Sequence, residues 1–81
     1  MSISVTIEPA ALDQLAGYLK NDPAVTAQIV RAIDSLTTDP TPTGSRAWGT
    51  SHRRWHVGAR RILYRISEAE NAVHVEHIGH A

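Results

Sequence analysis

Arginine is concentrated in one stretch of this 81-residue sequence, where it could bind a phosphate-bearing ligand. Six of the eight Lys and Arg residues lie between positions 46 and 65, and no Asp or Glu interrupts them. They are Arg46, Arg53, Arg54, Arg60, Arg61 and Arg65. The formal net charge of the chain is zero, and all eight acidic residues lie outside this stretch. A neutral chain with one basic surface is expected to bind an anion there, and single-stranded nucleic acid is the leading candidate.

Two other side chains in the stretch add to what it could do. Arginine stays protonated and suits phosphate clamping, whereas histidine can accept or donate a proton near neutral pH. His56 lies between Arg54 and Arg61, where its imidazole could carry out such a proton transfer. Trp48, beside Gly49, could stack on a base, as aromatic residues do in single-strand binders. The alternative is a solvated basic surface without a ligand.

Length and composition restrict the class of protein. We expect one small domain over residues 1–81, which buries only about 60% of its unfolded surface. The absence of cysteine excludes disulfides and thiolate metal sites and fits a reducing cytosol. Residues 1–8 lack the features of a signal peptide, and no apolar run approaches the roughly 20 residues of a membrane span. The expectation is a cytoplasmic protein without a membrane partner or a metal.

The first half of the sequence predicts a strand followed by two helices. Apolar and polar residues alternate over residues 3–8, which is typical of a half-buried strand. Residues 9–20 form a helix that begins at Pro9 and whose apolar face is Leu12, Leu15, Ala16 and Leu19. Asp22 is the N-cap of a second helix and Pro23 its first residue. The core face of that helix is Val25, Ile29, Ala32, Ile33 and Leu36. An antiparallel helical hairpin follows, and residues 37–45 then form a surface loop.

The second half predicts three β-strands. The segment 52–57 leads through Gly58 into 61–66, and a last strand begins at Val73, with a bulge or strand end near positions 76–77. One face carries Ile62, Tyr64 and Ile66 and packs on the helices. The other face carries Arg54, His56, Arg61 and Arg65. The order β-α-α-β-β-β predicts an α+β fold with the hairpin on one face of a mainly antiparallel sheet.

Two segments resemble the RelE/ParE superfamily of bacterial type II toxins. They are Leu36-Thr37-Thr38-Asp39-Pro40 and Arg54-Trp55-His56-Val57-Gly58-Ala59-Arg60-Arg61-Ile62-Leu63-Tyr64-Arg65-Ile66. The segment 73–80 is similar to the last strand of that family. The resemblance implies a growth-inhibiting toxin encoded beside a cognate antitoxin. It favours the RelE branch, whose members cut mRNA at the ribosome without a metal by activating a 2′-hydroxyl.

The resemblance also implies roles for individual residues. Arg61 is expected to clamp the phosphate, Arg54 to act as a second clamp and His56 to act as general base. His80 is a possible general acid. The remaining basic and aromatic candidates are expected to bind RNA: Arg46, Trp48, Arg53, Arg60 and Arg65. An acidic or amphipathic antitoxin segment is expected to cover the arginine face.

Two alternative functions remain open. One is inhibition of DNA gyrase, as in the ParE branch. The other is a catalytically impaired homologue that mainly binds its antitoxin, because the sequence ends at Ala81 where the family usually continues with an arginine and a short tail.

Overall fold

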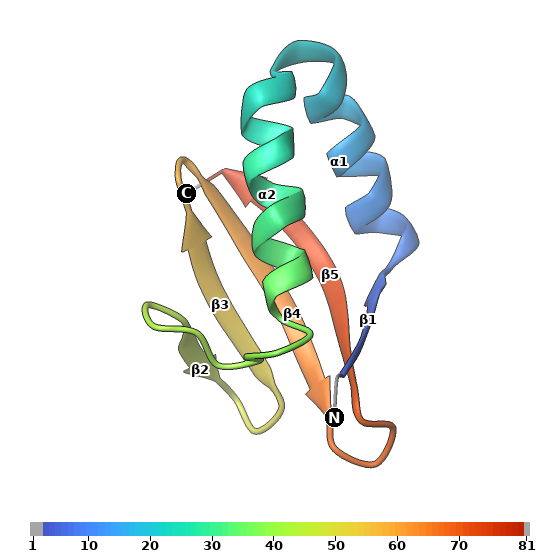
Figure 1. The fold of residues 1–81 in the computed structure, drawn as a ribbon, viewed down its shortest axis with the longest axis vertical. Coiled ribbons are helices and arrows are strands. Elements are labelled where there is room, and N and C mark those ends of the chain that lie inside the picture. Colours follow the sequence, from blue (N-terminus) through green and yellow to red (C-terminus); the bar gives the residue numbers. More distant parts are fainter. Residues whose placement is uncertain (1–2, 81) are drawn as a thin grey trace.

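Two helices lie side by side on one face of a five-stranded sheet (Figure 1). The computed structural model describes residues 3–80, so residues 1, 2 and 81 of the expected domain lie outside the described residues. The elements in chain order are β1 (Ser4–Ile7), α1 (Pro9–Asn21), α2 (Pro23–Ser35), β2 (Arg46–Trp48), β3 (His52–Val57), β4 (Arg60–Ser67) and β5 (Ala72–His80).

The sheet has the strand order β1-β5-β4-β3-β2. Strand β1 is parallel to β5, and every other neighbouring pair is antiparallel. The predicted α+β class, with a helical hairpin on one face of a mainly antiparallel sheet, is therefore confirmed. The prediction missed β2, a three-residue edge strand whose side chains are all exposed and which therefore has no buried, alternating face.

The junction between the helices forms as the sequence indicated. The carboxylate of Asp22 accepts a hydrogen bond from the backbone N–H of Val25 at 3.2 Å, which satisfies one free donor in the first turn of α2. Pro23 is at the start of α2 and Pro9 at the start of α1, where neither needs a backbone N–H. Neither described helix has the length and apolar character needed to cross a membrane.

The core lies between the helices and the sheet. Its buried residues are Ala11, Leu15, Ile29, Ile33, Leu36, Val57, Ile62, Tyr64, Val73, Val75 and Ile78. The assignment of the α1 face was partly wrong, because Leu12 and Leu19 are 52% and 57% exposed while Ala11 is fully buried. Helix α1 carries apolar residues on two adjacent stripes, and the periodicity could not decide which stripe meets the sheet.

The expected irregularity in the last strand is a β-bulge at Glu76. Leu63 pairs with His77, and the next residue, Tyr64, pairs with Val75, so Glu76 has no partner in the register. The extra residue lets Val75 and Ile78 both reach the core, although their separation of three would otherwise place them on opposite faces.

The loop between α2 and β2 is fixed to the helix side of the sheet. The buried phenol of Tyr64 donates a hydrogen bond to the carbonyl oxygen of Pro40 at 2.7 Å. The guanidinium of Arg53 donates to the hydroxyl and the carbonyl oxygen of Ser45, at 3.0 and 3.1 Å. These contacts hold the chain just before Arg46, and so they position β2.

Replacing Tyr64 with phenylalanine is expected to lower the free energy of unfolding by about 1 kcal/mol, because the carbonyl of Pro40 loses its donor.

Burial raises the pKa of Tyr64 above its ordinary value of 10.0. The stability linked to the neutral phenol is present below the unfolded-state pKa and is lost as pH rises through the higher folded-state pKa. Urea unfolding at neutral and alkaline pH should therefore show a smaller alkaline loss for Tyr64→Phe than for the wild type. An equal loss would contradict this account.

Candidate nucleic-acid interface

Four basic side chains converge on the face of the sheet that points away from the helices. Arg46 pairs with Arg54 across β2 and β3, and His56 pairs with Arg61 across β3 and β4. Paired residues in a sheet lie on the same face, with their Cβ atoms roughly 5 Å apart. Together with Gly44 they line a hollow of about 380 Å³, which we call the basic hollow. The structure thus brings together Arg54, His56 and Arg61, as expected.

The charge of the basic hollow is not balanced from within the described chain. Two arginines directly opposite one another are unfavourable in a sheet. Among residues 3–80, no acidic side chain forms an ion pair with any of the four basic residues. The Nε atom of Arg61 is also buried without a hydrogen-bond partner in this part of the chain, as is that of Arg60. An anion in the hollow would supply the missing acceptor.

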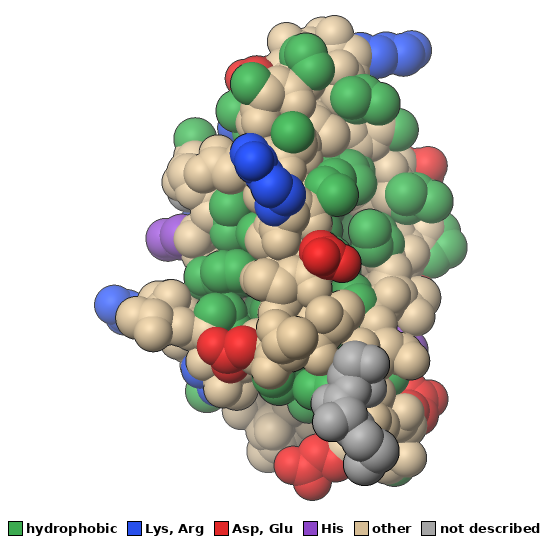
Figure 2. Space-filling view, in the orientation of Figure 1, with side chains coloured by type: hydrophobic (Ala, Val, Ile, Leu, Met, Phe, Trp, Pro, Cys, Tyr) green, Lys and Arg blue, Asp and Glu red, His purple; other side chains and the backbone are tan. Residues whose placement is uncertain are grey.

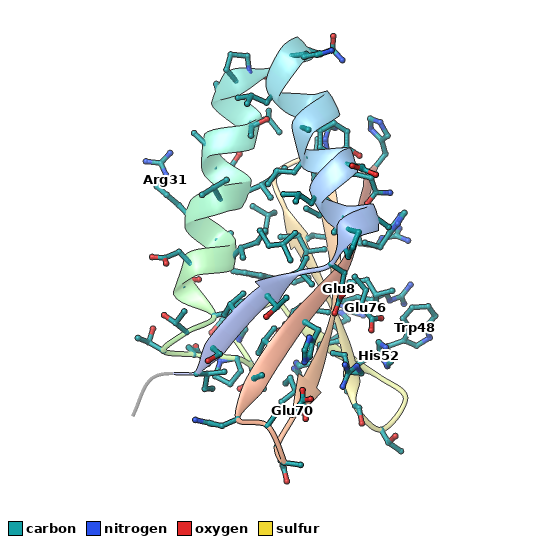
Figure 3. The ribbon with its side chains drawn as sticks, turned by 90° about the vertical axis from the view of Figure 1, so that its right-hand side faces the viewer. Glu8, Arg31, Trp48, His52, Glu70 and Glu76 are labelled. Atoms are coloured by element: carbon teal, nitrogen blue, oxygen red, sulfur yellow. The ribbon has the colours of Figure 1, made fainter. Side chains whose placement is uncertain are left out.

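Trp48 stands at the edge of the basic hollow on the same face. Figure 3 shows Trp48 and His52 beyond the sheet on one side, and Arg31 on the opposite, helical side. The guanidinium carbon of Arg54 lies 5.0 Å from the centre of the Trp48 ring, which is a cation–π contact. The contact orients Arg54, and Trp48 remains 52% exposed.

The other half of this face is neutralised by an acid that lies far from it in the sequence. One oxygen of Glu76 lies 2.9 Å from Nε2 of His52, and the other accepts a hydrogen bond from Nε of Arg65 at 3.4 Å. An acidic residue that lies outside the arginine-rich stretch of the sequence is thus beside it in the fold. Arg65 is on the predicted face, but its charge is partly compensated, because the bulge places Glu76 beside it.

A second histidine on this face is held between two carboxylates. Nδ1 of His74 lies 3.1 Å from Glu8, and Nε2 lies 2.7 Å from Glu70. The hydrogen bond to His74 holds the pKa of Glu70 below its ordinary value. Positive charge on this face is thus concentrated at the basic hollow.

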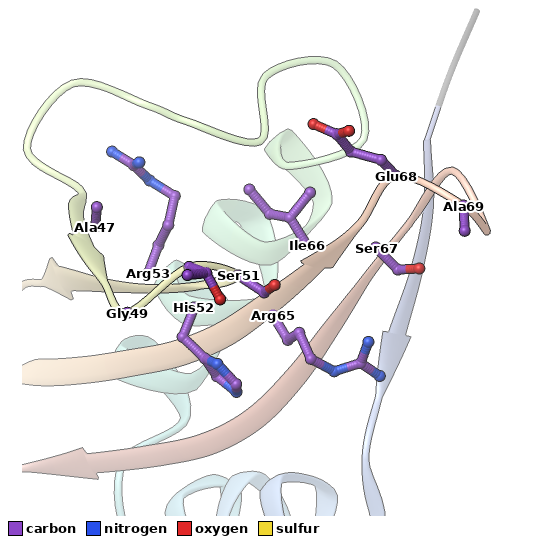
Figure 4. A pocket seen from close by; sticks show the side chains of 11 residues that line it. Ala47, Gly49, Ser51, His52, Arg53, Arg65, Ile66, Ser67, Glu68 and Ala69 are labelled. Carbon is purple, nitrogen blue, oxygen red and sulfur yellow. The ribbon is translucent and has the colours of Figure 1, made fainter.

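Arg53 projects from the other side of β3. Figure 4 shows Arg53 and Ile66 pointing to one side of the strands, while His52 and Arg65 point to the other. Because Arg53 pairs with the buried Tyr64 and binds Ser45, it lies on the helix side and anchors the loop. The structure does not place it with the basic hollow.

Arg60 and His80 also lie on the helix side and are paired across β4 and β5. Nη1 of Arg60 lies 3.1 Å from Nδ1 of His80, and its guanidinium carbon lies 4.5 Å from the centre of the Tyr18 ring. The sheet therefore separates both residues from His56 and Arg61. Among residues 3–80, no group of three or more His, Asp or Glu side chains is arranged to hold a metal ion.

Sequence reasoning missed three residues around this face. Gly44 borders the basic hollow with a φ of 94°, a conformation that favours glycine, and its only signal was its place in a Pro- and Gly-containing loop. Leu63 lies on the arginine face, where strand alternation could have placed it. Alternation from Val73 and Val75 places Glu76 on this face, but nothing in the sequence indicates that its carboxylate meets His52 and Arg65.

If this face binds single-stranded RNA, as the sequence predicts, replacing Glu76 with glutamine should strengthen that binding. The change leaves Arg65 and His52 without their acidic partner, so the face can neutralise about one more phosphate. The slope of log affinity against log salt should then steepen by about 0.7. Affinities for a short RNA measured over a range of salt concentrations test this. Asp13→Asn on α1 is the control, because it makes the same charge change on an exposed helical position, and an equal effect there would contradict a local role.

Comparisons with known proteins support the fold. No protein-family model and no curated protein matches the chain in sequence. Among solved structures, it is similar to the toxin–antitoxin complex RelBE2 from Mycobacterium tuberculosis, with 20% identity, 100% coverage of both chains and a TM-score of 0.82. The archaeal RelE–RelB complex from Pyrococcus horikoshii also has a TM-score of 0.82, with 15% identity and coverage of 99% of this chain and 96% of that one.

A double mutant of the Escherichia coli toxin RelE, in the free state, has a TM-score of 0.81 with 17% identity, and the match covers 100% of this chain and 85% of that one. These likenesses extend over all the elements described above, so the chain has the fold of the RelE-like toxins.

Proposed function

We propose that this chain is the toxin of a type II toxin–antitoxin system and that it cleaves mRNA at the ribosome without a metal. The observation that carries the proposal is the pairing of His56 with Arg61 on the exposed sheet face, with Arg54 beside them in one basic hollow. A possible proton acceptor and two cationic clamps thus line a space that can hold a phosphate. The resemblance of the segment 54–66 to the RelE branch, and the fold, support the same reading.

In the proposed reaction, His56 removes the proton of a ribose 2′-hydroxyl, and the 2′-oxygen attacks the adjacent phosphorus. A 2′,3′-cyclic phosphate forms as the bond to the 5′-oxygen breaks. Arg61 and Arg54 stabilise the charge that develops on the phosphate oxygens. The leaving 5′-oxygen takes its proton from solvent, because His80 lies on the other side of the sheet.

We infer that the partner is a cognate antitoxin, and that both proteins act in the cytoplasm, where the ribosomes are. Two of the similar structures are toxin–antitoxin complexes. The outer side of the helical hairpin offers an apolar surface that such a partner could cover (Figure 2). Leu12, Leu19 and Val30 are exposed there, around a groove of about 670 Å³ between α1 and α2. A monomeric protein rarely leaves so apolar a groove uncovered.

Induced expression in bacteria tests the proposal, with primer extension on cellular mRNA in the same culture. The wild type is expected to arrest growth and to produce new mRNA ends, and the double variant Arg54→Ala/Arg61→Ala to do neither. Growth arrest without new ends would contradict RNA cleavage and favour DNA gyrase as the target. Absence of arrest would favour a homologue whose main role is to bind its antitoxin.

A further inference from the structure

A second hollow of about 390 Å³ lies on the same face of the sheet as the basic hollow. It is lined by Trp48, Gly49, His52 and Leu63, and we call it the Trp48 hollow. Trp48 pairs with His52, and Leu63 pairs with Arg54, so these side chains stand on the arginine side. The two large apolar side chains make the Trp48 hollow chemically unlike its neighbour, which is lined by arginine and histidine.

Arg54 connects the two hollows. Its side chain lines the basic hollow, while its guanidinium carbon lies 5.0 Å from the centre of the Trp48 ring. A phosphate bound to Arg54 is therefore about one side chain away from the indole. A nucleotide has the same arrangement, with a charged phosphate and an apolar base separated by a sugar.

We propose that the Trp48 hollow binds one base of the RNA whose phosphate occupies the basic hollow. This inference rests on the proposed function and names the part of the substrate that the apolar lining recognises. Bases present an apolar face to aromatic side chains, and such stacking is a common source of affinity for single strands. Double-stranded nucleic acid does not fit, because its bases are stacked on one another and cannot reach the indole.

The backbone at Trp48 is held in place in the free protein. Trp48 is at the end of β2, which pairs with β3, and the chain before β2 is held by the hydrogen bonds between Arg53 and Ser45. The exposed indole thus stands on a supported strand and needs little ordering when a base binds.

The residues that line the Trp48 hollow also predict which bases it should prefer. The side chains of the Trp48 hollow that can hydrogen-bond are the indole of Trp48, through one N–H donor, and the imidazole of His52, whose Nε2 atom is already engaged by Glu76 at 2.9 Å. Few groups are left to read the edge of a base, so the hollow should accept all four bases. Purines should bind more tightly than pyrimidines, because they cover more of the indole.

Fluorescence can test the proposal directly, because the chain has only two tryptophans. In the variant Trp55→Phe, all indole emission comes from Trp48. The probe is a 2′-O-methyl RNA trinucleotide, which cannot be cleaved, and the control is an abasic trinucleotide with the same phosphates. The base-containing probe is expected to quench the emission at saturation, whereas the abasic probe leaves it nearly unchanged. Equal quenching by both probes, or by neither, would overturn the proposal.

Affinity provides a second readout that keeps Trp55 intact. Trp48→Ala is expected to weaken binding of the base-containing trinucleotide about tenfold or more, and to leave binding of the abasic one nearly unchanged. Trp48→Phe should retain most of the affinity. Leu63→Trp should weaken base binding without a change of charge, because it fills the hollow. Equal affinities of wild type and Trp48→Ala for the base-containing probe would overturn the inference.

These binding measurements are independent of cleavage. Base-dependent quenching in a protein that cuts no mRNA would refute the proposed reaction and keep the base site. Cleavage of mRNA by a protein that shows no base-dependent quenching would keep the reaction and refute the base site.

Discussion

Replacing His56 with alanine is expected to reduce mRNA cleavage by about 10² to 10⁴-fold while RNA affinity stays nearly unchanged. The imidazole is the only side chain in the basic hollow that can accept a proton near neutral pH, since the other three ionisable groups are arginines. Those arginines remain in the variant and continue to bind phosphate. A large loss of rate with intact binding is therefore the signature of a lost proton acceptor.

Single-turnover cleavage of a defined mRNA on programmed ribosomes, together with RNA affinity, measures both effects. His77→Ala is a matched control, because it removes an exposed imidazole of β5 that does not line the basic hollow. If His56→Ala cleaves at the wild-type rate, another group accepts the proton. If it loses affinity and rate equally, His56 serves in binding.

Arg61→Ala is expected to reduce cleavage by about 10² to 10³-fold, and it should also weaken RNA binding. Arg61 is directly opposite His56, so its guanidinium lies close to the proposed reacting phosphate, and among residues 3–80 its buried Nε has no hydrogen-bond partner that would compete for that phosphate. Arg61→Lys should recover part of the affinity but little of the rate, because an ammonium group keeps the charge and loses the planar fork.

The same assays and urea unfolding, applied to Arg61→Ala, separate a functional role from a structural one. No acidic residue among residues 3–80 pairs with Arg61, so the free energy of unfolding should not fall. Arg31→Ala, on the opposite side of the molecule (Figure 3), controls for the loss of one positive charge. Normal cleavage by Arg61→Ala, or a loss of activity that follows a loss of stability, would contradict the clamp.

Local patterns in the sequence predicted most of the fold. The alternation of residues 61–66 assigned Tyr64 to the core and Arg61 to the outer face, because a strand turns successive side chains to opposite sides. The Asp22-Pro23 pair located the start of α2 through a cap that involves only nearby residues. The resemblance of the segment 54–66 to the toxin family then predicted how these helices and strands assemble over the whole chain.

The features of the fold that could not be predicted from the sequence depend on contacts between distant segments. The strand β2 exists because β3 offers it an edge and the loop before it is anchored, and its own three residues carry no pattern. The exposure of Leu12 depends on how α1 is rotated against the sheet. The separation of His80 from the basic hollow depends on its register with Arg60.

The bulge at Glu76 has a consequence for how this surface can change over evolutionary time. Without Glu76, the last strand would read as a regular alternation in which Val73, Val75 and Ile78 all keep the core parity. The acid therefore behaves as a one-residue insertion that adds negative charge to the outer face and leaves the packed face as it was. Gain or loss of this single codon could adjust the attraction of the protein for polyanions with little effect on folding, so the two properties can be selected separately.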